Sequence, residues 1–336
     1  MGKIRSTLAK VGINGFFFAL IFMVVLAYVF PQFGEEEGIL PLGEVTDIGV
    51  FLIFFFYGVK LSPAQLRLGL SNYKLHLLIQ TSTFIIFPMV IILAHALIGS
   101  EENPYLWLGV FYLAALPSTV SSSVVMVSIA GGNLPAAIFN ASVSSLIGIL
   151  ITPLWMSVFM DVTGGGSDLS STVVKLSLQI LLPVILGFLL HKPLGSYVVK
   201  HQKTLKYFDQ AIILLIVYTA FAESFAKEMF AGNSFWDFMT IGGAMLLLFI
   251  FMMAVMWFIS TRMGFVLPDT ITVLFCGSKK SLVQGAVMGK VLFPDPLIFG
   301  IVLLPLMMYH SLQLLLGSAI AERFALQTKL KKGSVG

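Results

Sequence analysis

The chain has 336 residues, of which 58% are hydrophobic and 11% are charged, and its formal net charge at pH 7 is +4. A mean hydropathy of +0.97 excludes a soluble globular protein and indicates a polytopic protein in the lipid bilayer of a plasma membrane, or of the inner membrane if bacterial. The charge comes from lysines and arginines without interleaved aromatic residues, which excludes nucleic acid as a partner, and the single cysteine, Cys276, excludes an internal disulfide.

The first half of the sequence predicts five membrane helices after a basic N-terminus of residues 1–10. The apolar run at 11–30 is too long for the core of a signal peptide and no A-x-A cleavage site follows it, so we expect it to remain as the first helix. The other predicted helices of this half cover residues 48–59, 74–98, 105–130 and 136–160. An amphipathic connector at 60–73 precedes the third of the five, and a GGNLP turn at 131–135 precedes the last.

The second half repeats this plan after a Gly/Ser/Asp-rich linker at 161–171. Its predicted helices cover residues 172–190, 208–225, 235–259, 271–293 and 297–320. The two predicted five-helix units are therefore residues 11–160 and 172–322, followed by a polar tail at 323–336. Lysines and arginines of the predicted loops lie almost entirely on one side, which places both termini in the cytoplasm.

The predicted helix at 271–293 carries two adjacent lysines, Lys279 and Lys280, near its midpoint. A lysine at the centre of a membrane helix costs about 3 kcal/mol, so the pair needs partners, water or a function. The neighbouring Gly277, Ser278 and Ser281 favour a helix that is interrupted in the membrane beside a polar cavity. Gln284, four residues after Lys280, lies on the same face if the helix is regular there.

A second polar cluster, PSTVSSS at 117–123, lies in the predicted fourth helix. Its hydroxyl groups either line a cavity or bond within their own helix, and their density after a proline favours the cavity. The members of this cluster that we select as candidate binding residues are Ser118, Thr119, Ser121, Ser122 and Ser123. Asn140, Thr83 and His310 on other predicted helices are further candidates, although helix–helix hydrogen bonds also explain them.

The two polar clusters correspond to each other in an internal repeat. A shift of 160 positions pairs Ser118 with Ser278 and Ser121 with Ser281. Because each half has an odd number of helices, the halves would be inverted relative to the membrane. We therefore expect an all-α fold of ten transmembrane helices in two inverted repeats, whose discontinuous fourth and ninth helices cross at mid-membrane. Helix N-termini at such a crossing present free N–H groups, so an anionic group is the expected guest.

Three segments together resemble the bile acid:sodium symporter family, in particular a divergent branch that carries GSKKS: FFFYGVKLS at 54–62, LPSTVSSSVVMVSIAGGN at 116–133, and GSKKS with Gln284. The resemblance covers residues 11–321 and implies a core domain and a panel domain, with an organic anion moved together with sodium by alternating access. It also implies that Ser122 and Ser123 lie at or next to the family's sodium-binding Ser-Asn pair, and that Gln284 is its glutamine.

The chain departs from the family at the sodium ligands. The family's glutamate four residues before the glutamine is Lys280 here, and a glutamine of the third helix is Thr83. Because sodium needs several oxygens in one shell, sodium coupling stays open. Lys280 would either replace the cation, held by serines and carbonyls, or attract the anionic substrate, and a lysine that releases its proton would couple transport to H⁺. Lys279, about 100° round the helix, would face a cytoplasmic vestibule.

The sequence disfavours an enzyme, because it contains no H-E-x-x-H or G-x-S-x-G motif and no paired membrane aspartates. No organic cofactor is expected, and Na⁺ or H⁺ is the expected coupling ion. The alternative to a transporter of a small organic anion is a channel-like or regulatory membrane protein of ion homeostasis. The sequence indicates neither the substrate nor the oligomeric state.

Overall fold

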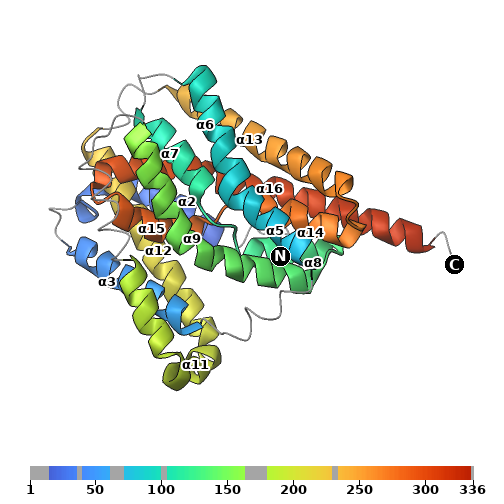
Figure 1. Cartoon of the computed structure of the whole chain (residues 1–336). Coiled ribbons are helices and arrows are strands. Elements are labelled where there is room, and N and C mark those ends of the chain that lie inside the picture. The colour runs from blue at the N-terminus through green and yellow to red at the C-terminus, as the bar shows by residue number, and fades with distance from the viewer. Residues whose placement is uncertain are drawn as a thin grey trace.

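A computed structural model describes residues 15–35, 40–60, 72–99, 104–162, 180–228 and 234–333. Every regular element in these residues is a helix (Figure 1). Six helices are long and apolar enough to cross a membrane, or up to seven if a bent pair is one span. The six are Leu42–Lys60, Tyr73–Ile98, Leu134–Phe159, Gln202–Ala226, Phe235–Arg262 and Pro296–Gln327. The predicted N-terminal segment 1–10, most of the connector 60–73 and most of the linker 161–171 lie outside the described residues.

One group of helices packs together. It contains α2 (Gly15–Val29), α3 (Leu42–Lys60), α11 (His191–Lys200) and α12 (Gln202–Ala226). The short 3-10 turn η1 (Pro31–Phe33) follows α2. α3 begins six residues before the predicted start at 48, because Glu44 lies in its first turn, where a carboxylate is stabilising. Glycines let α3 approach the helix Ile180–Leu189: a Cβ on Gly58 would lie 2.1 Å from the carbonyl oxygen of Val184.

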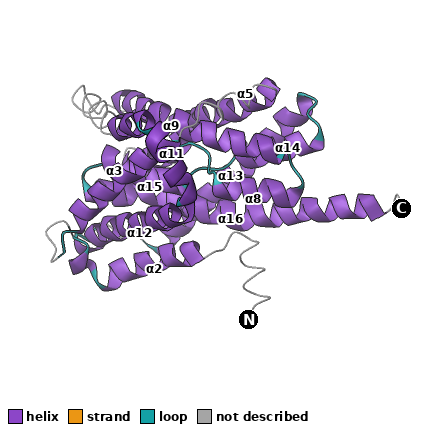
Figure 2. Ribbon diagram, turned by 90° about the horizontal axis from the view of Figure 1, so that it is seen from below, coloured by secondary structure: helices purple, strands orange, loops and turns teal. Residues whose placement is uncertain are grey.

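The prediction for residues 191–207 was a loop, and the structure corrects it. Helix Ile180–Leu189 bends by 95° into α11, which is amphipathic and carries lysines, so its hydropathy is too low to indicate a membrane helix. A second correction concerns α16 (Pro296–Gly333), which was predicted to end at 320. In Figures 1 and 2 its C-terminal end projects beyond the other helices.

The helix Tyr73–Ile98 contains a π-helical segment, and this segment frees two backbone carbonyls. It consists of α5 (Tyr73–Thr81), η3 (Ser82–Ile86) and α6 (Phe87–Ile98). The N–H of Phe87 donates to Ser82 O rather than to Thr83 O, and Pro88 has no N–H to donate to Phe84 O. The carbonyl of Phe84 instead accepts a hydrogen bond from Trp155 Nε1 at 2.7 Å. The carbonyl of Thr83 is left for a partner from another helix.

Candidate functional site

The first interrupted helix breaks at a proline. α7 (Pro104–Ala115) ends, residues 116–120 are not helical, and α8 (Ser121–Ala130) begins. Pro117 lacks the N–H that would continue α7, so the last carbonyls of α7 need other donors. Thr152 Oγ1 of α9 (Leu134–Val162) donates to Ala115 O at 2.8 Å. The carbonyls of Ala114 and Leu116, on either side of Ala115, still need hydrogen-bond donors.

The second interrupted helix breaks at the GSKKS segment. α14 (Leu267–Gly277) ends, residues 278–281 are not helical, and α15 (Leu282–Leu292) begins. Ser281 is the N-cap of α15, and its side chain accepts a hydrogen bond from the N–H of Gln284. The small polar residues of this segment thus end one helix and start the next.

The two breaks lie against each other. The N–H of Ser281 donates to Pro117 O at 2.9 Å, which joins the two interrupted segments through their backbones. Hydroxyl groups cover the carbonyls at the end of α14: Ser278 Oγ donates to Leu274 O at 2.6 Å, Ser123 Oγ to Phe275 O at 3.1 Å, Ser118 Oγ to Cys276 O at 2.7 Å, and Ser82 Oγ to Gly277 O at 2.8 Å. The predicted residues Ser118 and Ser123 therefore act as hydrogen-bond donors across the crossing.

Lys280 supplies hydrogen-bond donors for the free carbonyls at the break between α7 and α8. Its ammonium group donates to Thr83 O at 2.7 Å, to Ala114 O at 2.6 Å and to Leu116 O at 2.8 Å. It also lies 4.2 Å from the centroid of the Phe87 ring, within cation–π range. The side chain is fully buried. Three backbone oxygens from two helices thus surround the Lys280 amine at the crossing, and the hydroxyls of the predicted serine cluster take no part in holding it.

Lys279 is also fully buried, so its side chain does not face the expected open vestibule. Its Nζ lies 3.4 Å from Ser122 O, contacts the sulfur of Met126, and lies 5.4 Å from the centroid of the Phe275 ring. Among the described residues, no carboxylate lies within ion-pair distance of either lysine. The site therefore holds two lysine amines with no carboxylate partner from the described part of the chain.

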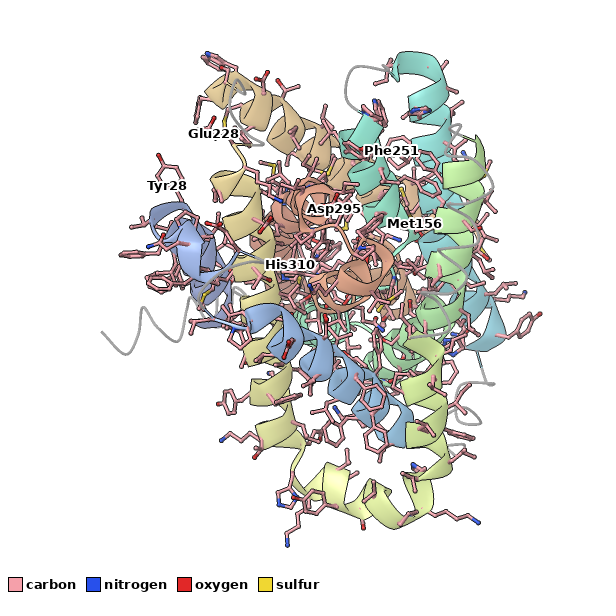
Figure 3. The ribbon with its side chains drawn as sticks, turned by 90° about the vertical axis from the view of Figure 1, so that its left-hand side faces the viewer. Tyr28, Met156, Glu228, Phe251, Asp295 and His310 are labelled. Carbon is pink, nitrogen blue, oxygen red and sulfur yellow. The ribbon has the colours of Figure 1, made fainter. Side chains whose placement is uncertain are left out.

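Gln313 on α16 holds the backbone of Lys280 with both ends of its amide. The N–H of Lys280 donates to Gln313 Oε1 at 2.9 Å, and Gln313 Nε2 donates to Lys280 O at 2.8 Å. His310 Nδ1 lies 2.8 Å from the same nitrogen, which makes it an acceptor for the second amide hydrogen. In Figure 3 His310 lies among the helices, whereas Tyr28 lies at the edge. The candidate His310 thus contacts Gln313, which holds the backbone of Lys280.

The remaining candidates have separate partners. Thr119 and Ser122 face each other, with 3.4 Å between their hydroxyl oxygens, and Gln284 Nε2 donates to Ser145 O at 3.1 Å. Thr83 contributes its carbonyl, because its hydroxyl donates within its own helix to Ile79 O. Ser121 is the first residue of α8, and its side chain is outside the described part of the structure. The three side chains predicted for a sodium site, those of Ser122, Ser123 and Gln284, therefore each have a different hydrogen-bond partner.

Asn140 does not lie with the two lysines. Its Nδ2 donates to His76 Nδ1 at 2.7 Å and to Ala136 O at 2.9 Å, and its Oδ1 accepts from Gln80 Nε2 at 3.2 Å. Asn140 therefore connects α9 to α5, and the expectation that it shares the cavity with the lysines is not supported by its contacts.

The candidate set missed four side chains at the crossing, those of Ser82, Thr152, Tyr309 and Gln313. Ser82 and Thr152 each cover a carbonyl of a broken helix, and Tyr309 OH donates to Ser278 O at 2.6 Å. Thr152 and Tyr309 are single polar side chains in apolar helices, which gives no signal that separates them from ordinary packing residues. Ser82 lies in the run Thr81 to Thr83, which helix–helix hydrogen bonds explain as well as a cavity does. Gln313, missed as well, had one signal: it lies three residues after His310, on the same helix face.

Comparison with known proteins gives consistent matches over almost the whole chain. A sequence model of the SBF-like CPA transporter family matches residues 14–326. The chain is 37% identical to the putative symporter YfeH of Escherichia coli over 318 residues, which is 94% of each protein. It is 36% identical to the uncharacterized protein PA2026 of Pseudomonas aeruginosa over 312 residues, 93% of each. It is 30% identical to sodium/bile acid cotransporter 7 of Danio rerio over 322 residues, 93% of this chain and 94% of the relative.

Proposed function

The chain belongs to the SBF-like CPA transporter family and is an integral, multi-pass membrane protein, and from this premise we propose that it is a secondary active transporter of a small organic anion. In this proposal Lys280 replaces a bound coupling cation. The observation that carries the proposal is the set of three carbonyl oxygens on the Lys280 ammonium group. Carbonyl oxygens converging on one point are the ligands of a hard cation, and here that point holds a covalently attached cation.

The architecture that we propose has ten membrane helices in two inverted repeats, residues 11–160 and 172–322, with both termini in the cytoplasm. The interruptions in α7–α8 and α14–α15 support it, because they occur at corresponding positions of the two halves and contact each other through Ser281 and Pro117. In this scheme the group formed by α2, α3, α11 and α12 belongs to a panel domain. Alternating access then arises from movement of this panel against a core that contains the crossing.

Sodium and a protonated Lys280 should not share the site. At ~4 Å and an effective dielectric constant of about 20, two unit positive charges oppose each other by roughly 4 kcal/mol, close to a thousandfold in affinity. We therefore expect transport to depend weakly on sodium, or to depend on it only when Lys280 is neutral. If Lys280 releases its proton during transport, H⁺ is the coupling ion.

Uptake into proteoliposomes tests the proposal. A thermal-shift screen of organic anions, with and without sodium, first supplies a substrate, and its uptake is then measured under imposed sodium or proton gradients. We expect replacing sodium by N-methylglucamine to change wild-type uptake little and Lys280→Ala to abolish uptake. Steep sodium dependence in the wild type that Lys280→Ala leaves unaffected would contradict the assignment. An ohmic current without saturable counterflow would favour the channel-like alternative.

A further inference from the structure

The two neighbouring lysines differ in how their hydrogen-bond donors are used. A lysine ammonium group has three N–H donors, and those of Lys280 have three carbonyl partners between 2.6 and 2.8 Å away. Lys279 has one carbonyl partner, Ser122 O, at the long distance of 3.4 Å, and a thioether sulfur, which is a weak acceptor. Lys280 has no donor left for a guest, whereas Lys279 does.

The surroundings of Lys279 do not neutralise its charge. It is fully buried, and no carboxylate of the described residues lies within ion-pair distance of it. A buried charge without a counter-charge is unfavourable, and such a group is retained where a ligand completes it. The aromatic ring of Phe275 and the backbone of Gly317, on which an added Cβ would lie 3.3 Å from Lys279 Cε, enclose the lysine without adding a negative charge.

A second feature on the same side of the crossing also favours an anion. Ser122, the residue that Lys279 reaches, lies in the first turn of α8. The first N–H groups of a helix have no partner within the helix and carry the positive end of its dipole. The N-cap of α8 is Val120, which makes no side-chain hydrogen bond to these groups. Lys279 contacts the carbonyl oxygen of Ser122, so the ammonium group and the uncapped helix N-terminus, two sources of positive potential, lie beside the same first turn of α8.

We propose that Lys279 and the N-terminus of α8 bind the negatively charged group of the transported solute, while Lys280 is a structural cation that does not contact it. The ligand chemistry is an oxyanion, such as a carboxylate or sulfonate on a small organic molecule. The inference rests on the proposed function, because it assigns the anion to one lysine of the same crossing.

Thermal unfolding of the purified, full-length protein tests the assignment without a known substrate. The probes are sulfate, a small divalent oxyanion, and benzoate, an apolar carboxylate, each compared with chloride at equal ionic strength. The variants are Lys279→Met, Lys279→Arg and Lys280→Met, with Lys206→Met as a control that removes an exposed lysine from α12. A ligand that binds only the folded state raises the unfolding temperature.

We expect at least one probe to raise the unfolding temperature of the wild type, the control, Lys279→Arg and Lys280→Met by more than that of Lys279→Met, since sulfate also stabilises folded proteins non-specifically. In chloride, Lys279→Met should unfold at or above the wild-type temperature, because it removes a buried charge without a counter-charge, whereas Lys280→Met should unfold below it. The inference is overturned if neither probe shifts the wild type, if Lys279→Met keeps the shift, or if the control loses it. Sodium-independent uptake with an unchanged KM in Lys279→Met would also overturn it while leaving the proposed function intact.

Discussion

Replacing Lys280 by methionine should destabilise the folded protein strongly. Methionine keeps most of the apolar stem but removes the ammonium group, so the carbonyls of Thr83, Ala114 and Leu116 lose their donor. A hydrogen bond to a charged group contributes about 1.5–3 kcal/mol net. Because the three bonds share one ammonium group they are not additive, and the cost of removing one partner of a buried ionic contact, about 3–5 kcal/mol, sets the expected loss. At roughly 2 °C per kcal/mol, the unfolding temperature should fall by about 6–10 °C.

The assay is thermal unfolding of the purified variant, followed by intrinsic tryptophan fluorescence. Lys206→Met, which removes an exposed lysine, should unfold within about 1 °C of the wild type, since surface substitutions rarely change stability by more than about 0.5 kcal/mol. If Lys280→Met unfolds at or above the wild-type temperature, the three carbonyls are satisfied in another way, and the ammonium group is not what holds the two broken helices together.

Three further substitutions test other contacts of the fold, each by thermal unfolding. Gln313→Met removes both hydrogen bonds to the backbone of Lys280 and should cost about 1–3 kcal/mol; an unchanged unfolding temperature would show that the amide does not hold this segment. Gly58→Ala forces a Cβ against the neighbouring helix and should cost about 1–3 kcal/mol. Its control, Gly43→Ala on the same helix, meets nothing within 4 Å and should be neutral or stabilising. Equal effects of the two substitutions would contradict the close approach of the helices. Trp155→Phe leaves a buried carbonyl without its donor and should cost about 1–3 kcal/mol, which a wild-type unfolding temperature would disprove.

The positions of the two helix breaks could be predicted from sequence because local residues cause them. Pro117 stops α7 by lacking an N–H, and the small polar residues of GSKKS end α14 and cap α15. The partners of Lys280 could not be predicted, because they are backbone carbonyls and every residue carries one. Pro88 indicated an irregularity in its helix, but only the π-helical hydrogen bond from Phe87 to Ser82 leaves the carbonyl of Thr83 free.

Asn140 shows a different limit of sequence reasoning. Helical periodicity gives the angle between residues on one helix, but it does not say which neighbouring helix a face meets. Asn140 meets His76 and Gln80 of α5 rather than the lysines. α11 was missed for a related reason: its lysines and its amphipathic pattern lower the hydropathy, which is the signal used to find membrane helices.

The central claim, that Lys280 takes the place of a bound sodium ion, is tested most directly by comparing the wild type with Lys280→Glu in sodium chloride and in N-methylglucamine chloride at equal ionic strength. The glutamate variant places a carboxylate beside the three carbonyl oxygens that now hold the ammonium group, so these oxygens need a free cation. We predict that sodium raises the unfolding temperature of Lys280→Glu and leaves that of the wild type unchanged. A sodium-dependent rise in the wild type as large as that in Lys280→Glu would contradict the account.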